Sequence, residues 1–433
     1  MSFVNLPDLT RLKTLMPADS LLRNRNFLRM WIASTVAVLG GSVSQLALPL
    51  TAVRILHASA GEMGLLFACG ALPFVLFSLP AGVWLDRRSK RSVIVGFNLL
   101  GGLALTVVPV AVMFNALSMP LLYAVEFAVG TGFCIGGSAA QVFITQLVGR
   151  ERLVEANSNQ ATATSIAGLI GPVVAGMLVG WLGAPTAVAL DALAFLVSGL
   201  LVASIRFREV PMKLSNRPVL EDMLEGLRFV WQHPLLRAFA IMAFMTLFLF
   251  DGFMALYVLH ATRNLHLSPS ELAAVNTLAA LGALAGAIAV PRLNRRIGKH
   301  VVITLGLGVA ALGFVAFSQA PSGEHAVILA GGAMFLLDAG VTGYTVNYLA
   351  MRQMITPDAM LGRMTSTMRF LSVSAAPIGS SISGYCADRY GIAAVLLTQG
   401  IALVGVSLLA RWLIARAVQD TALSNGEVVK SAA

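Results

Sequence analysis

The chain has 433 residues, of which 57% are hydrophobic and only 12% are charged, and its mean hydropathy is +0.82. Soluble domains carry about 25% charged residues, so this composition excludes a soluble multidomain enzyme and predicts a protein that crosses the membrane several times. The net charge of +10 does not indicate nucleic-acid binding, because Lys and Arg gather in alternate loops between apolar runs.

Residues 1–29 are polar and basic, and we expect them to form a cytoplasmic N-terminal segment rather than a cleaved signal peptide. Twelve apolar runs follow, each with about the 20 residues that a helix needs to cross ~30 Å of hydrocarbon. We predict transmembrane helices at 30–53, 62–84, 92–114, 120–147, 157–180, 186–205, 238–260, 270–290, 300–318, 326–350, 364–384 and 392–414.

The distribution of basic residues predicts which side of the membrane each loop occupies. Only Arg54, Arg263 and Arg389 lie in the loops of one side, whereas the loops of the other side hold nearly all the remaining Lys and Arg. Because basic loops stay in the cytoplasm, both termini are expected there. The longest loop, 206–237, is then also cytoplasmic, and its residues 220–230 have the spacing of an amphipathic surface helix.

The same loop divides the chain into two predicted six-helix bundles, at 30–205 and 238–414, with a cytoplasmic tail at 415–433. Three glycines of the fifth helix and its end recur 208 residues later with the same gaps. They are Gly171, Gly176 and Gly183 in the first half and Gly379, Gly384 and Gly391 in the second. We therefore predict an all-α integral membrane protein with 12 transmembrane helices in two pseudo-symmetric halves.

A dense group of charges, GVWLDRRSKR, joins the second and third predicted helices. Its glycine permits close helix approach, its aspartate can cap a helix or pair with an arginine, and its basic run holds the turn in the cytoplasm. An ordinary basic loop is the alternative, but it explains only the basic residues. The pattern resembles the loop between helices 2 and 3 of the major facilitator superfamily of secondary transporters, with a serine where the family has a glycine. The resemblance implies a conformational gate at Gly82, Asp86, Arg87, Lys90 and Arg91.

The resemblance extends over about residues 24–415, and it is strongest to the branch that contains the enterobactin exporter and macrolide-efflux proteins. Residues 147–179 carry most of it. Within this stretch Gly168, Gly171, Pro172 and Gly176 resemble the antiporter motif of the fifth helix, which the family links with export. Generic helix packing by small residues is the alternative.

Three departures from the family's pattern concern proton coupling rather than fold. Glu126 and Val129 stand where the fourth helix often has Arg and Gln. The stretch 40–45 of the first helix lacks the acid that many relatives carry. In the second-half copy of the loop motif, Pro291 and Arg295 replace the glycine and the aspartate.

Ionisable side chains inside the predicted helices are the candidates for coupling, because each costs at least ~2.5–3.5 kcal/mol at mid-bilayer. Helices 1, 4, 7 and 10 line the cavity in the superfamily, and Glu126, Asp251 and Asp338 belong to three of them. A carboxylate in a cavity of low dielectric binds protons readily, so we predict Asp338 and Asp251 as coupling acids, with Glu126 third. Structural pairing is the alternative. We expect Asp191 to cap the sixth helix and Arg369 to extend toward the inner surface.

Polar and aromatic side chains near these acids are candidates for the cavity wall. Thr342 and Thr345 share a helix face with Asp338, and Gln141 shares one with Glu126. Aromatic rings can stack on a planar substrate, although core packing or lipid contact is the alternative for each of them. The predicted cavity-lining residues are Gln45, Gln141, Thr342, Thr345, Phe248, Tyr257 and Tyr344.

Together these observations predict a multi-pass transporter of the bacterial inner membrane that exports a siderophore-like metabolite or a drug by proton antiport. Proton-coupled uptake of a small organic solute is the alternative. An embedded enzyme is disfavoured because the sequence has no nucleophile or metal constellation. A non-transporting membrane protein is disfavoured because the tails and the central loop are too short for a soluble domain, and the lack of a GxxxxGK[ST] phosphate loop argues against direct coupling to ATP. We expect no cofactor, no metal and no nucleic-acid partner. The expected partners are a small organic substrate, protons and the lipid bilayer, and the expected state is a monomer.

Overall fold

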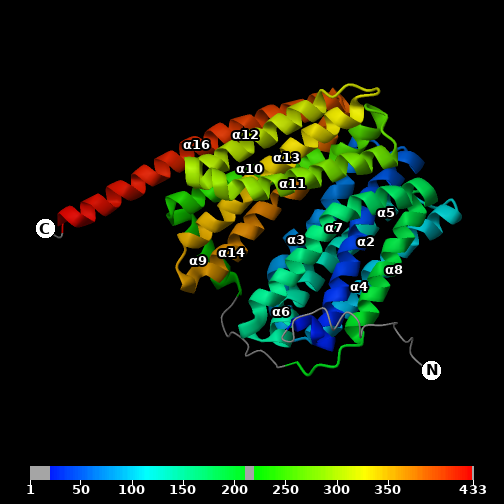
Figure 1. Ribbon diagram of the computed structural model, residues 1–433, viewed down its shortest axis with the longest axis horizontal. Helices are drawn as coiled ribbons and strands as arrows, with labels where there is room; N and C mark the ends of the chain where they lie inside the picture. The colour runs from blue at the N-terminus through cyan, green and yellow to red at the C-terminus, as the bar shows by residue number, and fades with distance from the viewer. Residues whose placement is uncertain (1–19, 210–218, 432–433) are drawn as a thin grey trace.

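The computed structural model describes residues 20–209 and 219–431, and every regular element in these two ranges is a helix. The helices form two bundles that meet at one end and diverge toward the other (Figure 1). The predicted N-terminal segment, 1–29, and the predicted central loop, 206–237, lie partly outside the described residues.

The first bundle begins with the short helix η1 (Leu21–Arg23). Its fourth span is interrupted by a π-helical turn, η2 (Gly132–Gly136), and a second short helix, η3 (Arg150–Arg152), precedes the fifth span. The long helices are α2 (Arg25–Ile55), α3 (Ala60–Asp86), α4 (Lys90–Met113), α5 (Met119–Thr131), α6 (Gly137–Val148), α7 (Leu153–Leu182) and α8 (Ala184–Ala203).

The second bundle follows an amphipathic helix of 14 residues, α9 (Val219–Gln232), which is too short to cross a bilayer. This helix lies in the stretch where the sequence predicts a surface helix. The remaining helices are α10 (Pro234–Arg263), α11 (Pro269–Ile297), α12 (Lys299–Ser318), α13 (Ala326–Met354), α14 (Asp358–Val373), α15 (Ala375–Tyr390) and α16 (Ile392–Ser431).

Eleven helices of the described chain are long and apolar enough to cross a membrane, with α5, η2 and α6 counted as one. The remaining predicted span, 364–384, consists of two helices of 16 residues, α14 and α15, which meet at Ser374. With this pair counted as one span, the structure confirms the predicted 12-helix fold. The expectation of one continuous helix at this position was wrong.

The two halves begin their second spans in the same way. Ser59 precedes α3, where its hydroxyl accepts from the Glu62 N–H at 3.2 Å and its own N–H donates to the Glu62 carboxylate at 2.8 Å. Ser268 and Glu271 repeat this capping box before α11, at 3.3 Å and 2.7 Å. Each box satisfies N–H groups that the helix cannot pair by itself. The repeat seen in the glycine spacing therefore extends to helix caps.

The glycines that end α7 and α15 have the same backbone conformation in both halves. Gly183 has a φ of 80° and Gly391 a φ of 86°, and both use the left-handed region that L side chains rarely adopt. Their equivalent positions support the predicted duplication.

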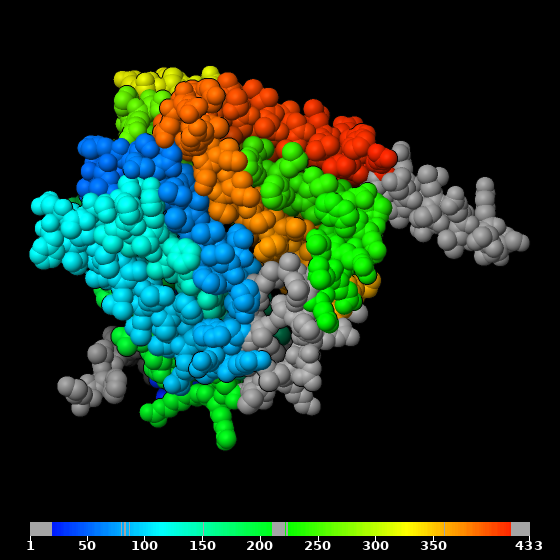
Figure 2. Space-filling model, turned by 180° about the vertical axis from the view of Figure 1, so that it is seen from behind, coloured from blue at the N-terminus to red at the C-terminus, as the bar shows by residue number. Residues whose placement is uncertain are grey.

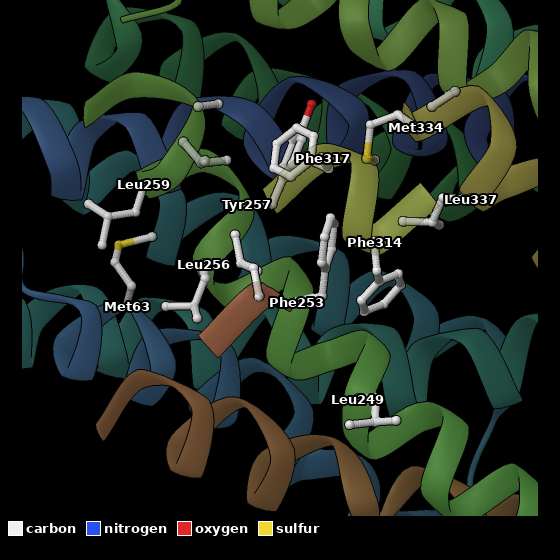
Figure 3. Close-up of a cluster of buried hydrophobic side chains, with 14 of the residues drawn as sticks. Met63, Leu249, Phe253, Leu256, Tyr257, Leu259, Phe314, Phe317, Met334 and Leu337 are labelled. Carbon is white, nitrogen blue, oxygen red and sulfur yellow. The ribbon is translucent and has the colours of Figure 1, made fainter. Parts of the chain in front are cut away.

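The core of the second half is built on aromatic rings from α10 and α12. Phe253, Phe314 and Phe317 are fully buried, and the Phe253 ring centroid lies 4.2 Å from that of Phe314 and 5.3 Å from that of Phe317. Met334 and Leu337 of α13 belong to the same cluster (Figure 3). Because lipid tails are as apolar as these side chains, tight packing rather than water exclusion holds the helices together here.

Replacing Phe253 with alanine should therefore destabilise the second half. Aromatic-to-alanine changes in packed cores cost about 3–5 kcal/mol, so we expect a clearly lower melting temperature of the purified protein in detergent. Leu103→Ala is the matched control, because Leu103 is 62% exposed on the bundle surface. Equal melting temperatures for the two variants would contradict this role of the aromatic cluster.

Candidate functional site

A carboxylate of the second half caps a helix of the first half. Asp388 of α15 accepts hydrogen bonds from the backbone N–H groups of Ala60 and Gly61, both at 2.9 Å, and from the Ser59 hydroxyl at 3.3 Å. These N–H groups belong to the first turn of α3, where the helix offers them no partner. The helix dipole also favours a negative charge at this position. Asp388 thus binds the two halves to each other.

A second polar contact between the halves lies beside this cap. The guanidinium of Arg263, at the end of α10, donates to the carbonyl groups of His57 at 3.0 Å and Ala58 at 2.8 Å. Both carbonyls follow the C-terminal end of α2, where the helix dipole favours a cation. We call the end of the molecule that contains residues 56–61, Arg263 and Asp388 the closed end.

Small residues bring the helix backbones of the two halves together. In the contact of α3 with α15, Gly64 lies against Gly384 and the Ser380 carbonyl. In the contact of α7 with α11, Gly176 lies against Ala273 and the Pro269 carbonyl. A Cβ atom at either glycine would overlap these neighbours. Close backbone approach of this kind is typical of helix contacts in membranes.

The opposite end of the molecule, which we call the basic end, contains the turn 87–89 and the turn at Gly298. In the described parts of the chain, the hydrogen bonds that join the two halves all lie at the closed end. Toward the basic end the bundles diverge, with α6 on one side and α9 on the other (Figure 1).

At the basic end, Glu209 fixes the start of α4. Its carboxylate accepts from the Ser89 hydroxyl and the Lys90 N–H, both at 2.6 Å, and from the Arg91 N–H at 3.0 Å. The segment after α8 thereby caps the helix that follows the charged turn. Glu209 is not among the residues predicted from the sequence, although an isolated acid among basic loop residues is a visible signal.

The intramembrane acids separate into two groups. In the first half, Glu126 of α5 lies against Gly70 of α3, and Asp191 of α8 lies against a glycine of α2. In the second half, Asp251 is half-buried on α10 and Asp338 is half-buried on α13. The predicted acids therefore do not form one cluster.

A family model described as Major Facilitator Superfamily matches residues 30–372 and 239–430, which together cover most of the chain. The chain belongs to the Major Facilitator Superfamily. It is therefore a multi-pass membrane transporter and not an enzyme, and the family prediction from the charged turn is confirmed.

Similar proteins within the superfamily include efflux pumps. The multidrug efflux pump Tap of Mycolicibacterium fortuitum is 27% identical over 397 residues, covering 88% of this chain and 94% of the pump. Macrolide efflux protein A of Streptococcus pyogenes is 20% identical with the same coverage. In fold the chain is similar to the nucleoside transporter NupG, with a TM-score of 0.74 at 12% identity over 90% of this chain and 98% of that structure.

The gate predicted from the superfamily turn is only partly described. Gly82 and Asp86 belong to the last turns of α3, but their surroundings lie outside what the structure describes. Arg87 is exposed, Lys90 is buried, and the Arg91 guanidinium donates at 2.7 Å to a backbone carbonyl in the segment after α8. The gating role of these residues stays a prediction.

The four residues of the fifth-helix motif have different surroundings in α7. Gly168 has no neighbour in contact range, and Gly171 packs on Ser42 of the same half. Pro172 is half-buried, and Gly176 lies in the contact between the halves described above. The end of α7 that carries Gly176 is thus the part that contacts the second half.

The predicted polar residues of the cavity wall are accessible to different degrees. Gln45 is exposed although it is flanked by buried residues of α2, and Gln141 of α6 is also exposed. Thr342 and Thr345 are half-buried on α13, where Thr342 lies against Gly286 of α11. An exposed amide within an otherwise buried stretch makes Gln45 the best placed of these residues to meet a solute.

The aromatic candidates are mostly packed. Tyr257 is 5% exposed, and its hydroxyl donates to Asn276 at 2.5 Å. Tyr344 is 4% exposed and stacks on the Tyr348 ring at 5.4 Å. Phe248 is half-buried, and its backbone contacts Gly379 of α15. In this conformation Tyr257 and Tyr344 have the core packing that the sequence left open as the alternative.

One expectation about charged residues was wrong. Asp191 does not cap its helix: α8 begins at Ala184 after Gly183, and Asp191 lies mid-helix, 1% exposed, with neither carboxylate oxygen hydrogen-bonded among the described residues. Arg369 is exposed on α14, and its extension toward the inner surface stays a prediction. The sequence places both residues on helices but not the direction in which they point.

Removing the Asp388 carboxylate should open the closed end. Hydrogen bonds to charged groups contribute about 1.5–3 kcal/mol, so Asp388→Ala should raise the population of molecules separated there by about tenfold or more. Spin labels at Asn115 and Glu324, which are exposed in loops of opposite halves, would report the distance in a background without native cysteines.

Arg389→Ala is the matched control, because Arg389 contacts Tyr385 of its own helix rather than the other half. An unchanged distance distribution in Asp388→Ala would contradict the role of this cap.

Proposed function

We propose that the chain exports small organic molecules of the drug type by alternating access, with protons as the coupling ion. The similarity to two efflux pumps over 88% of this chain and 94% of theirs is the observation that supports export most directly. Because identity is 20–27%, it supports the class of substrate rather than a particular compound.

The proposal includes an orientation in the membrane. Loops rich in Lys and Arg remain in the cytoplasm, so the basic end faces the cytoplasm and the closed end faces outward. In this conformation the outer contacts are made and the halves diverge toward the cytoplasm. A solute then enters between the halves from the inside, and release requires the Asp388 and Arg263 contacts to break.

Proton coupling is proposed for the acids of the cavity helices. Asp251 and Asp338 are half-buried, and neither has a hydrogen bond or ion pair to another described side chain. A carboxylate in such surroundings exchanges a proton without losing a structural partner. Protonation from outside and release inside, with opposite occupancy by the solute, would drive export. Glu126 is the third candidate.

Export is tested by the accumulation of compounds in cells with and without the protein. We expect cells that produce the chain to accumulate less of at least one compound from a panel that includes a macrolide, and to lose this difference when the proton gradient is collapsed. Metabolites in the medium, with and without iron, are compared in the same cells to detect a siderophore-like substrate.

Lower accumulation that survives collapse of the gradient would reject proton coupling. Higher accumulation in the producing cells would favour uptake, and no difference for any compound or metabolite would reject export.

Neutralising a coupling acid should uncouple transport from the proton gradient. We expect Asp338→Asn and Asp251→Asn to reduce export driven by a pH gradient in reconstituted vesicles by about 5–150-fold, the factor that corresponds to the usual coupling free energies between two sites. Asp358→Asn is the control, because Asp358 is exposed at the start of α14. Full gradient-driven transport by both variants would contradict the assignment.

A further inference from the structure

A pocket of about 170 Å³ lies between the start of α10 and the last apolar turns of α16. One face of α10 contributes Pro234, Arg237, Ala238 and Ile241, at the spacing that places residues on the same side of a helix. The adjacent face of α16 contributes Trp412, Leu413 and Arg416. Figure 2 shows the red part of α16 beside the green start of the second half.

The pocket lies where the apolar part of both helices ends. Arg237 is in the first turn of α10, and Arg416 closes the apolar stretch of α16, 392–416. Both therefore belong to the basic end, and the helix continues beyond this level to Ser431 (Figure 1). Residues at such a boundary face lipid headgroups rather than acyl chains.

The charges of the pocket are unbalanced. Arg237 and Arg416 are both exposed, and no acidic residue of the described chain lines the pocket with them. The Arg416 guanidinium lies over the Trp412 ring at 5.4 Å, which orients it. Two guanidinium groups from different helices suit a phosphate group, because each presents paired N–H donors to its oxygens.

The remaining lining residues are apolar. Ile241, Leu413 and Ala238 continue from the arginines toward the hydrocarbon side, so a ligand with both a phosphate and an acyl chain matches the pocket better than free phosphate does. A second pocket, of about 240 Å³, is lined by Lys299, His300, Met351, Met354 and Ile355. The Lys299 amino group donates to the Met354 sulfur at 3.3 Å, and this second pocket has no pair of guanidinium groups.

We propose that the pocket between α10 and α16 binds an anionic phospholipid, with its phosphate between Arg237 and Arg416 and an acyl chain along Ile241 and Leu413. Bound lipid would join the two helices at the basic end. Because α10 carries Asp251 and the closed-end residue Arg263, the lipid would stabilise the helix that holds one of the proposed coupling acids and one of the outer contacts.

Lipid binding to the purified full-length chain tests this site without any measurement of transport, and so independently of the proposed function. The protein is titrated with phosphatidylglycerol or phosphatidylcholine, and bound lipid is counted by native mass spectrometry. We expect phosphatidylglycerol to bind more tightly, and the preference to fall about fivefold in Arg237→Gln or Arg416→Gln and further in the double variant, as the loss of one or two surface cations predicts.

Three controls define the result. Arg411→Gln removes the same charge from α16 at an exposed position outside the pocket, and it should keep the preference for phosphatidylglycerol. If the glutamine variants misfold, the double variant with Arg237→Lys and Arg416→Lys is used instead, and it should keep much of the preference. Inorganic phosphate should not displace the lipid. Equal binding of both lipids, equal loss in Arg411→Gln, or displacement by phosphate would each overturn the proposal.

Discussion

The closed end depends on one carboxylate that pairs with the first turn of a helix in the other half. Inside a bilayer no hydrophobic force draws apolar helices together, so close packing and a few polar contacts determine how the two bundles meet. Asp388 and Arg263 provide those polar contacts, and both use backbone groups at helix ends that would otherwise lack partners. Toward the basic end the bundles diverge, and the hydrogen bonds of the described chain that join the halves lie at the closed end.

The fold could be predicted from the sequence because each span must satisfy its backbone hydrogen bonds within a helix. Apolar length therefore located the helices, and the glycine spacing located the repeat. Whether each span forms one unbroken helix was harder to predict. The π-helical turn at Gly132–Gly136 lies in an apolar stretch with no sequence signal for it. The break at Ser374 lies in a weakly apolar stretch that contains Arg369, and Pro377 follows it by three residues. Because a proline lacks the N–H that would continue the helix ladder, this second interruption had a signal in the sequence.

The candidate site could be predicted only in part, for a related reason. The acids of helices 4, 7 and 10 were found because a charge inside an apolar run is conspicuous. Their partners depend on how each helix is rotated against its neighbours, and this rotation cannot be read from a single sequence. Asp191, for example, faces α2 rather than capping α8. The charges that join the halves were visible as rare charged residues in one set of loops, but nothing in their spacing indicated a partner across the molecule.

The duplication also shows why the two contacts between the halves are not equivalent. The capping boxes at Ser59 and Ser268 are repeated, yet the position equivalent to Asp388, 208 residues earlier, is Gly180, which has no carboxylate and around which a Cβ atom would meet open space. The contact of α3 with α15 therefore adds a carboxylate cap to its glycine packing, whereas that of α7 with α11 has the glycine packing without such a cap. Glycine packing is common to both contacts, so the hydrogen bonds to the Asp388 carboxylate add to the free energy needed to separate α3 from α15. Breaking this cap is therefore the step that distinguishes separation of α3 from α15 from separation of α7 from α11.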